Sequence, residues 1–284
     1  MKCYTWPSRA RQKSLLVALP SSILYTDQTL ELKTIKASFL ARILSIFRVT
    51  RAILYPGLED KGRDLRVLRK LLEYSLTPPH LKRKLHPLTR TLKYAGLMQP
   101  LRLPNHELPL RPVKGVVIDG YVEACTEHIC RVFLGELGYG VIENRGYKPG
   151  DVVTVSLRGV KGEEVLLEQA SWGSIYTGFD ITVVNNIGAY LKKLKGRGYV
   201  IIGATKEGEC SHETFKKAIS RALSRKGLVL IIGSPYHDIL DYAPRSVLDY
   251  EVNTVPFQGT ISVRSEEALL ATLALINFYI REPG

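Results

Sequence analysis

Apolar runs of strand length alternate with helical patterns in the first part of the chain. Residues 14–23 form one such run, which Pro20 and the two serines behind it bring to an end. A second strand is predicted at residues 46–55, and residues 64–74 repeat apolar positions at helical spacing. A helix is also predicted between the two strands. Strand, helix and strand in this order predict a parallel sheet of the α/β class.

The helix between these strands is predicted to begin after a polar turn. Asp27 and Thr29 are both suited to cap it, because their side chains can accept a hydrogen bond from a free backbone N–H group. Its apolar positions, at intervals of three and four residues, are Leu32, Ile35, Phe39 and Ile43. We expect this face to pack on the sheet.

A different pattern begins at residue 113, where short alternating runs are separated by glycine-rich turns. Strands are predicted at residues 113–122, 129–134, 139–143, 151–157 and 164–169. Five short strands in a segment of this size predict a small barrel of the OB type. Prolines mark the linker in front of it, and the α/β pattern returns behind it. We therefore predict an OB-like insert at residues 102–170, between two parts of the α/β domain at residues 1–101 and 171–284.

The second part of the α/β domain is predicted to supply a pocket. Helices are predicted at residues 181–194 and after Ser211, and buried strands at residues 199–204 and 228–232 and before Val252. The three strands end in small or polar residues: Gly203, Ala204 and Thr205; Gly233, Ser234 and Pro235; Asn253, Thr254 and Val255. Open parallel sheets bind ligands at the carboxyl ends of their strands, so these residues predict one composite pocket.

The loop at residues 252–263 joins the third of these strands to a last helix. Pro256 fixes one backbone angle, and Gly259 permits a backbone approach that a Cβ atom would block. The helix is predicted to start with Ser265 as its N-cap. Its buried face is predicted to consist of Leu269, Leu273, Ile276 and Ile280. Such a loop can hold a small ligand with backbone groups; an ordinary buried loop is the alternative.

The net charge of +13 at pH 7 is confined to one part of the chain. Residues 1–100 contain 19 Lys and Arg against 6 Asp and Glu, whereas residues 101–284 contain 21 of each kind. Such segregation favours a polyanionic partner. Nucleic acid is favoured over a membrane surface, because no predicted helix combines a basic face with exposed large apolar residues. The residues expected to contact phosphates are Lys82, Arg83, Lys84, Arg90 and Lys93.

The cysteines do not indicate a site. Cys3, Cys125, Cys130 and Cys210 show neither a disulfide nor a zinc pattern. Cys125, His128 and Cys130 could supply three metal ligands, but a fourth is not evident, and alternating strand geometry would divide the three between two faces. We therefore expect no metal.

Composition indicates a soluble globular protein, with 45% hydrophobic residues and a mean hydropathy of -0.01. No apolar run is long enough to cross a membrane, and residues 1–13 lack the apolar core of a signal sequence. We expect a cytoplasmic location and no membrane partner.

The C-terminal stretch Val252-Asn-Thr-Val-Pro-Phe-Gln-Gly-Thr260, with Val263-Arg-Ser-Glu-Glu-Ala268, resembles the C-terminal signature of the SPOUT class of knotted RNA methyltransferases. The similar branch is the archaeal and eukaryotic one that carries an OB-like insert. Further matches are Ile46-Phe-Arg-Val49, Tyr94-Ala-Gly-Leu97 with Pro100-Leu101, Lys148-Pro-Gly-Asp151 and Tyr176-Thr-Gly-Phe179. Thr177 stands where the family usually has a large aromatic residue, so the resemblance implies no stacking role there.

The resemblance implies a trefoil knot, a homodimer and S-adenosylmethionine as the cofactor. It implies that the cofactor lies on Gly203, Ala204, Thr205, Gly208, Gly233, Ser234, Pro235, Val252, Asn253, Thr254, Val255, Gln258 and Gly259, with Thr260 and Ile261 closing over it. The implied activity is methyl transfer to an RNA, with ribosomal RNA favoured, and either a base nitrogen or the ribose 2′-oxygen as the target. This chemistry needs no metal.

The chemical step requires a positioned nucleophile and a group that handles a proton. The candidate catalytic residues are Arg48, Glu207, Asn253 and Arg264. Glu207 could equally be a solvated loop acid, and Arg264 could pair with a carboxylate of the last helix.

Two other functions remain open from the sequence. A non-catalytic RNA-binding protein could use the same fold as a scaffold, and it would bind no cofactor. A dinucleotide-dependent enzyme is disfavoured, because Gly-x-Gly-x-x-Gly does not follow the first strand. For RNA binding, the insert offers aromatic residues that can stack on bases: Tyr121, Phe133, Tyr139 and Tyr147. The alternative, a place in the barrel core, is favoured for Phe133.

Overall fold

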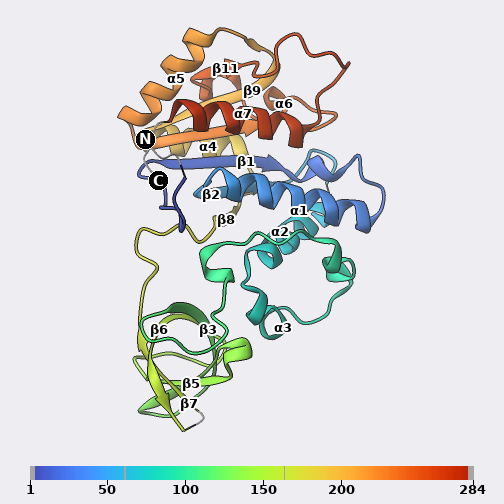
Figure 1. Cartoon of the computed structure of the whole chain (residues 1–284). Helices are drawn as coiled ribbons and strands as arrows, with labels where there is room; N and C mark the ends of the chain where they lie inside the picture. The colour runs from blue at the N-terminus through green and yellow to red at the C-terminus, as the bar shows by residue number, and fades with distance from the viewer. Residues whose placement is uncertain (1–3, 61, 163, 281–284) are drawn as a thin grey trace.

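The described residues, 4–60, 62–162 and 164–280 of the computed structural model, form two β-sheet bodies (Figure 1). Within these residues, the larger body is a six-stranded parallel sheet with helices on both faces, in the upper part of Figure 1. The smaller body is a closed five-stranded barrel below it. The predicted α/β class with an inserted barrel is therefore confirmed.

The parallel sheet has the strand order β11-β9-β10-β1-β2-β8. Its strands are β1 (Ser14–Pro20), β2 (Arg51–Tyr55), β8 (Asp180–Val183), β9 (Tyr199–Glu209), β10 (Gly227–Ile232) and β11 (Tyr250–Val252). Along β1, Leu15 and Val17 belong to the core on one face, and Leu16 and Ala18 to the core on the other. Burial on both faces explains why β1 is continuously apolar in the sequence.

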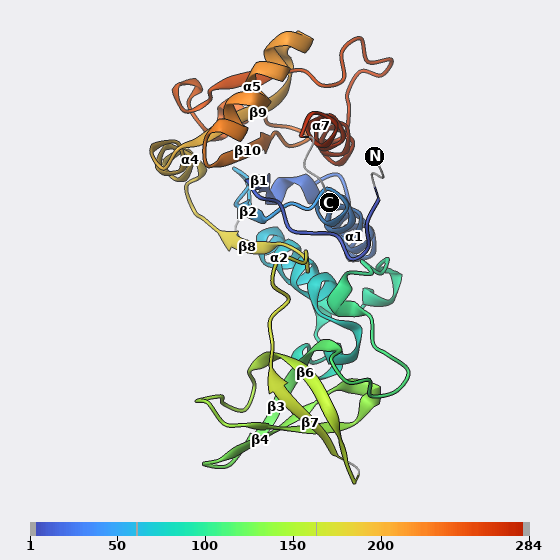
Figure 2. The same ribbon diagram turned by 60° about the vertical axis from the view of Figure 1, so that its left-hand side comes forward.

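Helices cover both faces of the sheet. One face carries α1 (Leu30–Ile46), α2 (Arg63–Leu76), α5 (His212–Ser224) and α7 (Ser265–Tyr279). The other carries α4 (Ile187–Gly196) and the short α6 (Ile239–Tyr242). Figure 2 shows α4 and α7 on opposite sides of β10. Among the helices described, none is long and apolar enough to span a bilayer.

The helix caps at Thr29 and Ser211 are those that the sequence predicts. Oγ1 of Thr29 accepts a hydrogen bond from the backbone N–H group of Leu32 at 3.2 Å. Oγ of Ser211 accepts one from the N–H group of Thr214 at 3.3 Å. Each cap satisfies a donor that the first helical turn leaves free.

The prediction of which side of α1 packs on the sheet is mostly wrong. Leu32, Ile35 and Phe39 are 48%, 46% and 38% exposed, whereas Ile43 is buried as predicted. The side that packs on the sheet consists of Ala37, Leu40, Ala41, Ile43 and Leu44. Because α1 is apolar on both sides, its periodicity does not identify the side that packs. The consequence is an apolar strip on the surface of the molecule.

Two other predicted elements are placed differently by the structure. Helix α1 continues to Ile46, so the strand predicted at residues 46–55 begins only at Arg51. The helix predicted at residues 181–194 is divided between β8 and α4, with Asn186 as the N-cap of α4. A short apolar run fits a strand or a helix equally, and pairing with β2 makes the first part a strand here.

The last helix buries the face predicted for it: Leu269, Leu273, Ile276 and Ile280. Its start is displaced by one residue, because the N-cap is Arg264 and Ser265 is already helical. The backbone N–H group of Arg264 donates to Oε2 of Glu267 at 2.9 Å. An acid at this position that accepts from the N-cap backbone stabilises the start of a helix. It also fixes the end of the loop that precedes α7.

The inserted barrel has the strand order β3-β4-β5-β7-β6. Its strands are β3 (Val117–Cys125), β4 (Ile129–Phe133), β5 (Tyr139–Glu143), β6 (Val152–Lys161) and β7 (Glu164–Gln169), in agreement with the five predicted. Val122, Val132 and Val155 lie in its core. Leu103, in the segment that leads into the barrel, packs instead in the core of the parallel sheet. Along the chain, the compact barrel therefore begins well after residue 103.

A buried carboxylate joins the barrel to the segments on both sides of it. Oδ2 of Asp119, on β3, accepts from Nδ2 of Asn105 at 3.0 Å. Its Oδ1 accepts from Nε1 of Trp172 and from Oγ1 of Thr154, both at 2.8 Å. The backbone oxygen of Asp119 accepts from Nε2 of His80 at 2.8 Å. Asn105 precedes the barrel and Trp172 follows it, so one side chain fixes both connections.

The prediction that the cysteines are unpaired is wrong for Cys125 and Cys130. They form a disulfide across the β3–β4 hairpin, where they face each other with Cα atoms 4.0 Å apart. The alternation argument treats both as members of one strand, whereas a turn between them makes them partners on two strands. Cys3 lies outside the described residues, and Cys210 is a free thiol. The part of the chain that the structure describes contains no cluster of His, Cys, Asp and Glu side chains suited to a metal ion.

Candidate active site

The carboxyl ends of β9, β10 and β11 lie side by side at one edge of the sheet. In the middle strand, Gly203 pairs with Ile231 of β10 on one side and with Glu251 of β11 on the other. The structure therefore brings together the three predicted strand ends, residues 203–205, 233–235 and 253–255.

Strand β9 leaves its ladder with β11 at this edge. The register shifts between Glu251 and Val252, so that Glu251 faces Gly203 but Val252 faces Glu209. Residues 204–208 lie between these pairs and form an excursion, so β9 runs beyond its predicted end at residue 204. A Cβ atom at Gly208 would lie 2.4 Å from the backbone carbon of Val252, so only glycine fits this crossing.

The excursion is tied to the segment that follows β10. Oγ1 of Thr205 donates to Oδ2 of Asp238 at 2.7 Å, and Asp238 is the N-cap of α6. In the same segment, Oγ of Ser234 lies 3.2 Å from Oη of Tyr242. Oη of Tyr242 lies 2.8 Å from Oγ of Ser22, just behind β1. Hydroxyl and carboxylate groups therefore hold three neighbouring strand ends together.

The segment after β11 is tied to the same excursion. Nδ2 of Asn253 donates to the backbone oxygen of Lys206 at 3.0 Å, and its Oδ1 accepts from the N–H group of Val255 at 2.9 Å. Oγ1 of Thr254 lies 2.7 Å from Oγ1 of Thr272 on α7. The side chains of Asn253 and Thr254 thus fix the path of the loop.

The remainder of the loop before α7 is open to solvent. Phe257 and Ile261 are 100% and 101% exposed. Nε2 of Gln258 donates within the loop, to the backbone oxygen of Thr260 at 2.8 Å. A Cβ atom at Gly259 would meet nothing within 4 Å. Apolar side chains in solvent beside an open glycine are typical of a loop that a ligand or a second chain covers.

Glycine occupies the two strand ends at residues 203 and 233 for a different reason. A Cβ atom at Gly203 would lie 2.3 Å from Cδ1 of Ile239, and one at Gly233 would lie 2.9 Å from the backbone oxygen of His237. Packing inside the protein therefore accounts for both. Of the four glycines predicted for the site, Gly259 alone leaves its side-chain space open.

The candidate catalytic residues do not all meet within one chain. Glu207 is an exposed carboxylate in the excursion, next to the residue whose oxygen Asn253 contacts. Nη1 of Arg264 lies 3.8 Å from Oε1 of Glu266, which is the helix pairing that the sequence leaves open. Arg48 precedes β2 and therefore lies at the amino-terminal edge of the sheet, opposite the strand ends that carry Glu207 and Asn253.

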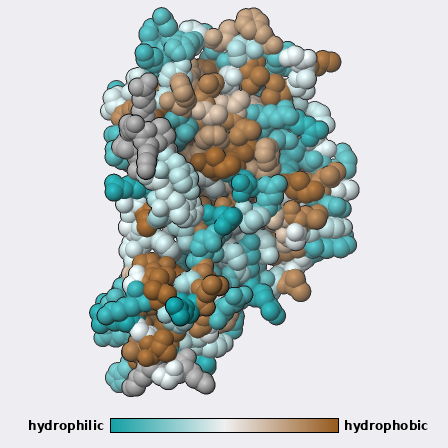
Figure 3. All heavy atoms as spheres, in the orientation of Figure 1, coloured by the Kyte–Doolittle hydropathy of each residue, from teal (hydrophilic) through white to brown (hydrophobic). Residues whose placement is uncertain are grey.

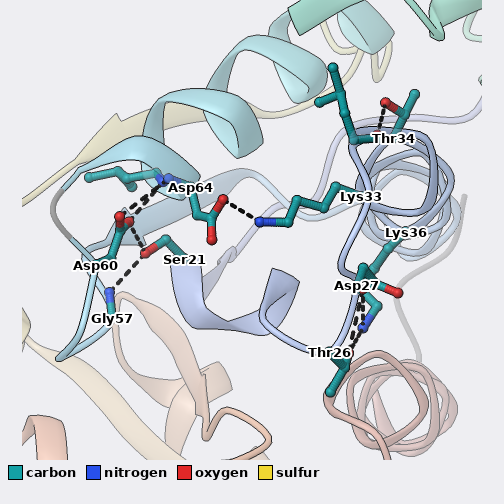
Figure 4. Close-up of polar contacts among 11 residues, drawn as sticks. Ser21, Thr26, Asp27, Lys33, Thr34, Lys36, Gly57, Asp60 and Asp64 are labelled. Carbon is teal, nitrogen blue, oxygen red and sulfur yellow. Dashed lines mark hydrogen bonds and ion pairs between the residues drawn. The ribbon is translucent and has the colours of Figure 1, made fainter.

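A buried lysine beside the strand ends was not predicted. Nζ of Lys36, on α1, lies 2.7 Å from Oδ2 of Asp27 and 3.4 Å from Oε1 of Glu266, the second residue of α7. It also donates to Oγ1 of Thr26 at 2.7 Å (Figure 4). Its side chain is only 5% exposed. A lysine on the small-residue side of α1 was the available signal, because buried charges need partners.

A partly buried carboxylate, Asp60, closes the turn after β2. Oδ2 of Asp60 accepts from Oγ of Ser21 at 2.5 Å and from the N–H group of Leu65 at 2.9 Å (Figure 4). Burial opposes ionisation of Asp60, but these hydrogen bonds outweigh it and lower its pKa. Burial, and next the charge of Asp60, raise the pKa of Tyr25 to about 12. Neither group therefore titrates near neutral pH, and the hydrogen bonds of Asp60 fix the turn.

The predicted phosphate-binding residues lie on and behind α3 (Lys82–Leu85), between the sheet and the barrel. Arg83, Arg90 and Lys93 are exposed. Nζ of Lys82 lies 4.3 Å from the centroid of the Tyr74 ring, and burial lowers its pKa. Lys84 extends to the barrel instead. Lys82 is thus held against a ring of the protein, whereas Lys84, Arg83, Arg90 and Lys93 are exposed.

Comparison with known proteins gives a family match over most of the chain. Residues 14–276 match the family described as "Putative RNA methyltransferase". The 28S rRNA (uridine-N(3))-methyltransferase of Drosophila melanogaster is 26% identical over 93% of this chain, which spans 61% of the length of the fly protein. An uncharacterized protein of Haloarcula marismortui is 27% identical, over 92% of this chain and 97% of its own. Among solved structures, the TrmH/SpoU tRNA modifying enzyme of A. aeolicus matches 95% of this chain and 77% of its own at 12% identity, with a TM-score of 0.41.

Proposed function

The chain belongs to the RNA methyltransferase family that matches residues 14–276, and we propose that it transfers a methyl group from S-adenosylmethionine to ribosomal RNA. The family supports the reaction class. The name of the fly relative, a 28S rRNA (uridine-N(3))-methyltransferase, supports ribosomal RNA as the substrate and N3 of a uridine as the target atom.

The observation that carries the proposal is the joined edge of β9, β10 and β11 with the open loop before α7. The free space at Gly259 fits a ligand that is held by backbone groups. The exposed side chains of Phe257 and Ile261 are available to cover an apolar part of it. These features fit S-adenosylmethionine, which residues 203–205, 233–235 and 252–261 would hold.

S-adenosylmethionine supplies an electrophilic methyl group. The protein therefore has to bind the cofactor, orient the target nucleotide towards it and accept the proton that is released. Asn253 and Thr254 orient the loop through their hydrogen bonds to Lys206 and Thr272. Glu207, the exposed carboxylate of the excursion, is our candidate for the group that accepts the proton leaving the uridine base.

A homodimer through α1 and α7 is part of the proposal. The two helices contact each other. Both expose large apolar side chains: Leu32, Ile35, Phe39 and Ile46 on α1, and Leu270, Leu275 and Phe278 on α7. In Figure 3, which has the orientation of Figure 1, hydrophobic residues lie on the surface over α7 and α1. A second copy would cover this surface. A trefoil knot is proposed with it.

Two measurements test the proposed function. Calorimetry should detect S-adenosylmethionine binding, and Glu207→Gln should keep that affinity while losing most of the RNA methylation. Mass spectrometry of ribosomal RNA nucleosides should find 3-methyluridine that depends on the gene. A non-catalytic RNA-binding protein, the alternative, binds no cofactor and leaves the nucleosides unchanged.

Light scattering tests the proposed homodimer. Phe39→Glu should give a monomer, and a monomeric wild-type protein would refute the homodimer.

A further inference from the structure

Aromatic side chains form a row across the outer surface of the barrel. Tyr121 of β3 faces Phe133 of β4, and Phe133 faces Tyr139 of β5. Val122 and Val132, their neighbours in the chain, point into the barrel core. Since successive strand residues point to opposite faces, the three rings point outward. The residues Tyr121, Phe133 and Tyr139 are called the aromatic row below.

Phe133 is not part of the barrel core, although the sequence favours that place for it. Tyr147 is the aromatic residue that packs against the core instead. The centroids of the Phe133 and Tyr139 rings lie 5.5 Å apart. Adjacent rings on the outside of a barrel do not fill its core, and the stabilisation that a cross-strand pair gives the sheet is small.

Two cations and a carboxylate surround the aromatic row. Nζ of Lys84 lies 5.1 Å from the centroid of Phe133, and the guanidinium carbon of Arg131 lies 3.8 Å from that of Tyr139. Oε1 of Glu123 lies 2.6 Å from Nζ of Lys84 and accepts from Oη of Tyr139 at 3.3 Å. An anionic oxygen is thus already accommodated between the ammonium group of Lys84 and the hydroxyl group of Tyr139. A phosphate oxygen has the same charge and acceptor chemistry.

We propose that the aromatic row binds a single-stranded segment of the RNA substrate, with unpaired bases on the rings and phosphates on Lys84 and Arg131. The inference rests on the proposed function, which supplies an RNA substrate. Adjacent strands lie about 4.8 Å apart, so the row offers stacking surfaces at short intervals. Every base has a π face, so this binding is tolerant of sequence.

The charge and the geometry both favour a single strand of RNA as the occupant. Lys84 belongs to the part of the chain that holds all of the excess positive charge, residues 1–100. Lys84 is also a residue of α3, next to the exposed Arg83, so a second cation lies on the same short helix. A duplex fits the rings poorly, because its bases are stacked on one another and present only edges and backbone.

Anisotropy of a short fluorescent oligouridylate, titrated with the full-length protein, tests the proposal. Phe133→Ala and Tyr139→Ala should each lower the affinity about tenfold through the loss of one stacked base, and Phe133→Trp should retain it. Val160→Ala is the matched control, because Val160 is an exposed apolar residue of β6 that pairs with Val165 of β7, outside the aromatic row. A hairpin duplex of the same length should bind more weakly and be indifferent to the ring variants.

Calorimetry with S-adenosylmethionine separates this proposal from the proposed function. The ring variants should bind the cofactor as the wild type does. Unchanged oligouridylate affinity in both alanine variants, or an equal loss with the duplex, would overturn the proposal; the first result would leave the row as a surface for a protein partner. A wild-type protein that binds oligouridylate through the row but does not bind S-adenosylmethionine would refute the proposed function and support the row.

Discussion

The side-chain ammonium group of Lys84 lies 2.6 Å from Oε1 of Glu123, so an ion pair joins α3 to strand β3 of the barrel. Lys84 and Glu123 are both partly exposed, at 34% and 30% of their side chains. Solvent screens such a pair, and its contribution to stability is small. Its position beside the aromatic row points to a role in binding.

Glu123→Gln is expected to increase the affinity for oligouridylate about threefold at low salt, because it removes a charge that competes with phosphates for Lys84. Glu143→Gln is the matched control: it removes an exposed carboxylate at the end of β5, paired with Arg145. Anisotropy titrations of both variants give the comparison. A lower affinity in Glu123→Gln would show that the ion pair positions Lys84 for RNA instead.

Gly259→Val is expected to abolish S-adenosylmethionine binding in a protein that still folds. A Cβ atom at this position meets nothing within 4 Å, and the valine side chain would extend into the space assigned to the cofactor. Gly208→Ala is the contrasting variant, since its Cβ atom would lie 2.4 Å from the backbone of Val252 and should lower the Tm. Calorimetry and thermal melts distinguish the two effects. Unchanged cofactor affinity in Gly259→Val would remove Gly259 from the site.

Replacing Arg83, Arg90 and Lys93 with Ala should weaken RNA binding for many sequences alike. These exposed cations are expected to contact phosphates, so the slope of log affinity against log salt should flatten by roughly 0.7 to 0.9 per lost contact. The control variant replaces three exposed lysines of the second part of the chain, Lys192, Lys216 and Lys217. Equal slopes in the first variant and the wild type would show that the basic run faces solvent.

Replacing residues 112–170 with a Gly-Ser linker should leave a protein that binds S-adenosylmethionine but methylates RNA poorly. This choice of ends keeps Leu103 in the core of the parallel sheet. Every residue assigned to the cofactor site comes after residue 200 in the sequence. Asn105 and Trp172 lose their carboxylate acceptor, so the Tm should fall modestly. Full methylation without the barrel would contradict the prediction, as would loss of cofactor binding together with the fold.

Acid is expected to destabilise the junction between barrel and sheet. Burial lowers the pKa of His106 from 6.5 to about 4, although its Nε2 donates to the backbone oxygen of Leu76. A folded-state pKa below the unfolded one means that the unfolded chain binds more protons, so stability is lost as the pH falls from about 6.5 to about 4. Between pH 7 and pH 5 the loss for His106 is on the order of 2 kcal/mol.

Denaturant unfolding at these two pH values checks this prediction, with His106→Gln as the comparison. The variant should depend less on pH by about the same amount. Burial also lowers the pKa of His80, so part of the dependence should remain. A variant as sensitive to acid as the wild type would exclude His106 as the cause.

Most strands could be predicted because each is a local pattern; β8, most of which is predicted as helix, is the exception. The run at β1 is apolar on both faces, and the barrel strands alternate between glycine-rich turns. The packing side of α1 could not be predicted, since Leu32 and Ala37 both belong to apolar sides of one helix. The choice between them depends on the sheet and on the surface left for a second chain.

The candidate site could be predicted only as a set of strand ends. Parallel strands place their carboxyl ends together, so the meeting of residues 203–205 and 233–235 follows from pattern alone. The contact of Lys36 with Glu266 joins two helices at opposite ends of the chain, and no local pattern contains it. The opposite position of Arg48, by contrast, follows from the predicted parallel sheet, because Arg48 stands near the start of the strand predicted at residues 46–55.

Asp119 holds the segment that enters the barrel through Asn105 and the segment that leaves it through Trp172. Because Asp119 belongs to the barrel itself, these bonds fix both connecting segments to it, and Nε2 of His80, just after α2, donates to the backbone oxygen of the same residue. Together these contacts restrict the movement of the barrel relative to the sheet. The barrel would act as a ruler: it would admit an RNA whose unpaired stretch lies at the right distance from the target nucleotide, and it would select by spacing where base stacking is indifferent to sequence.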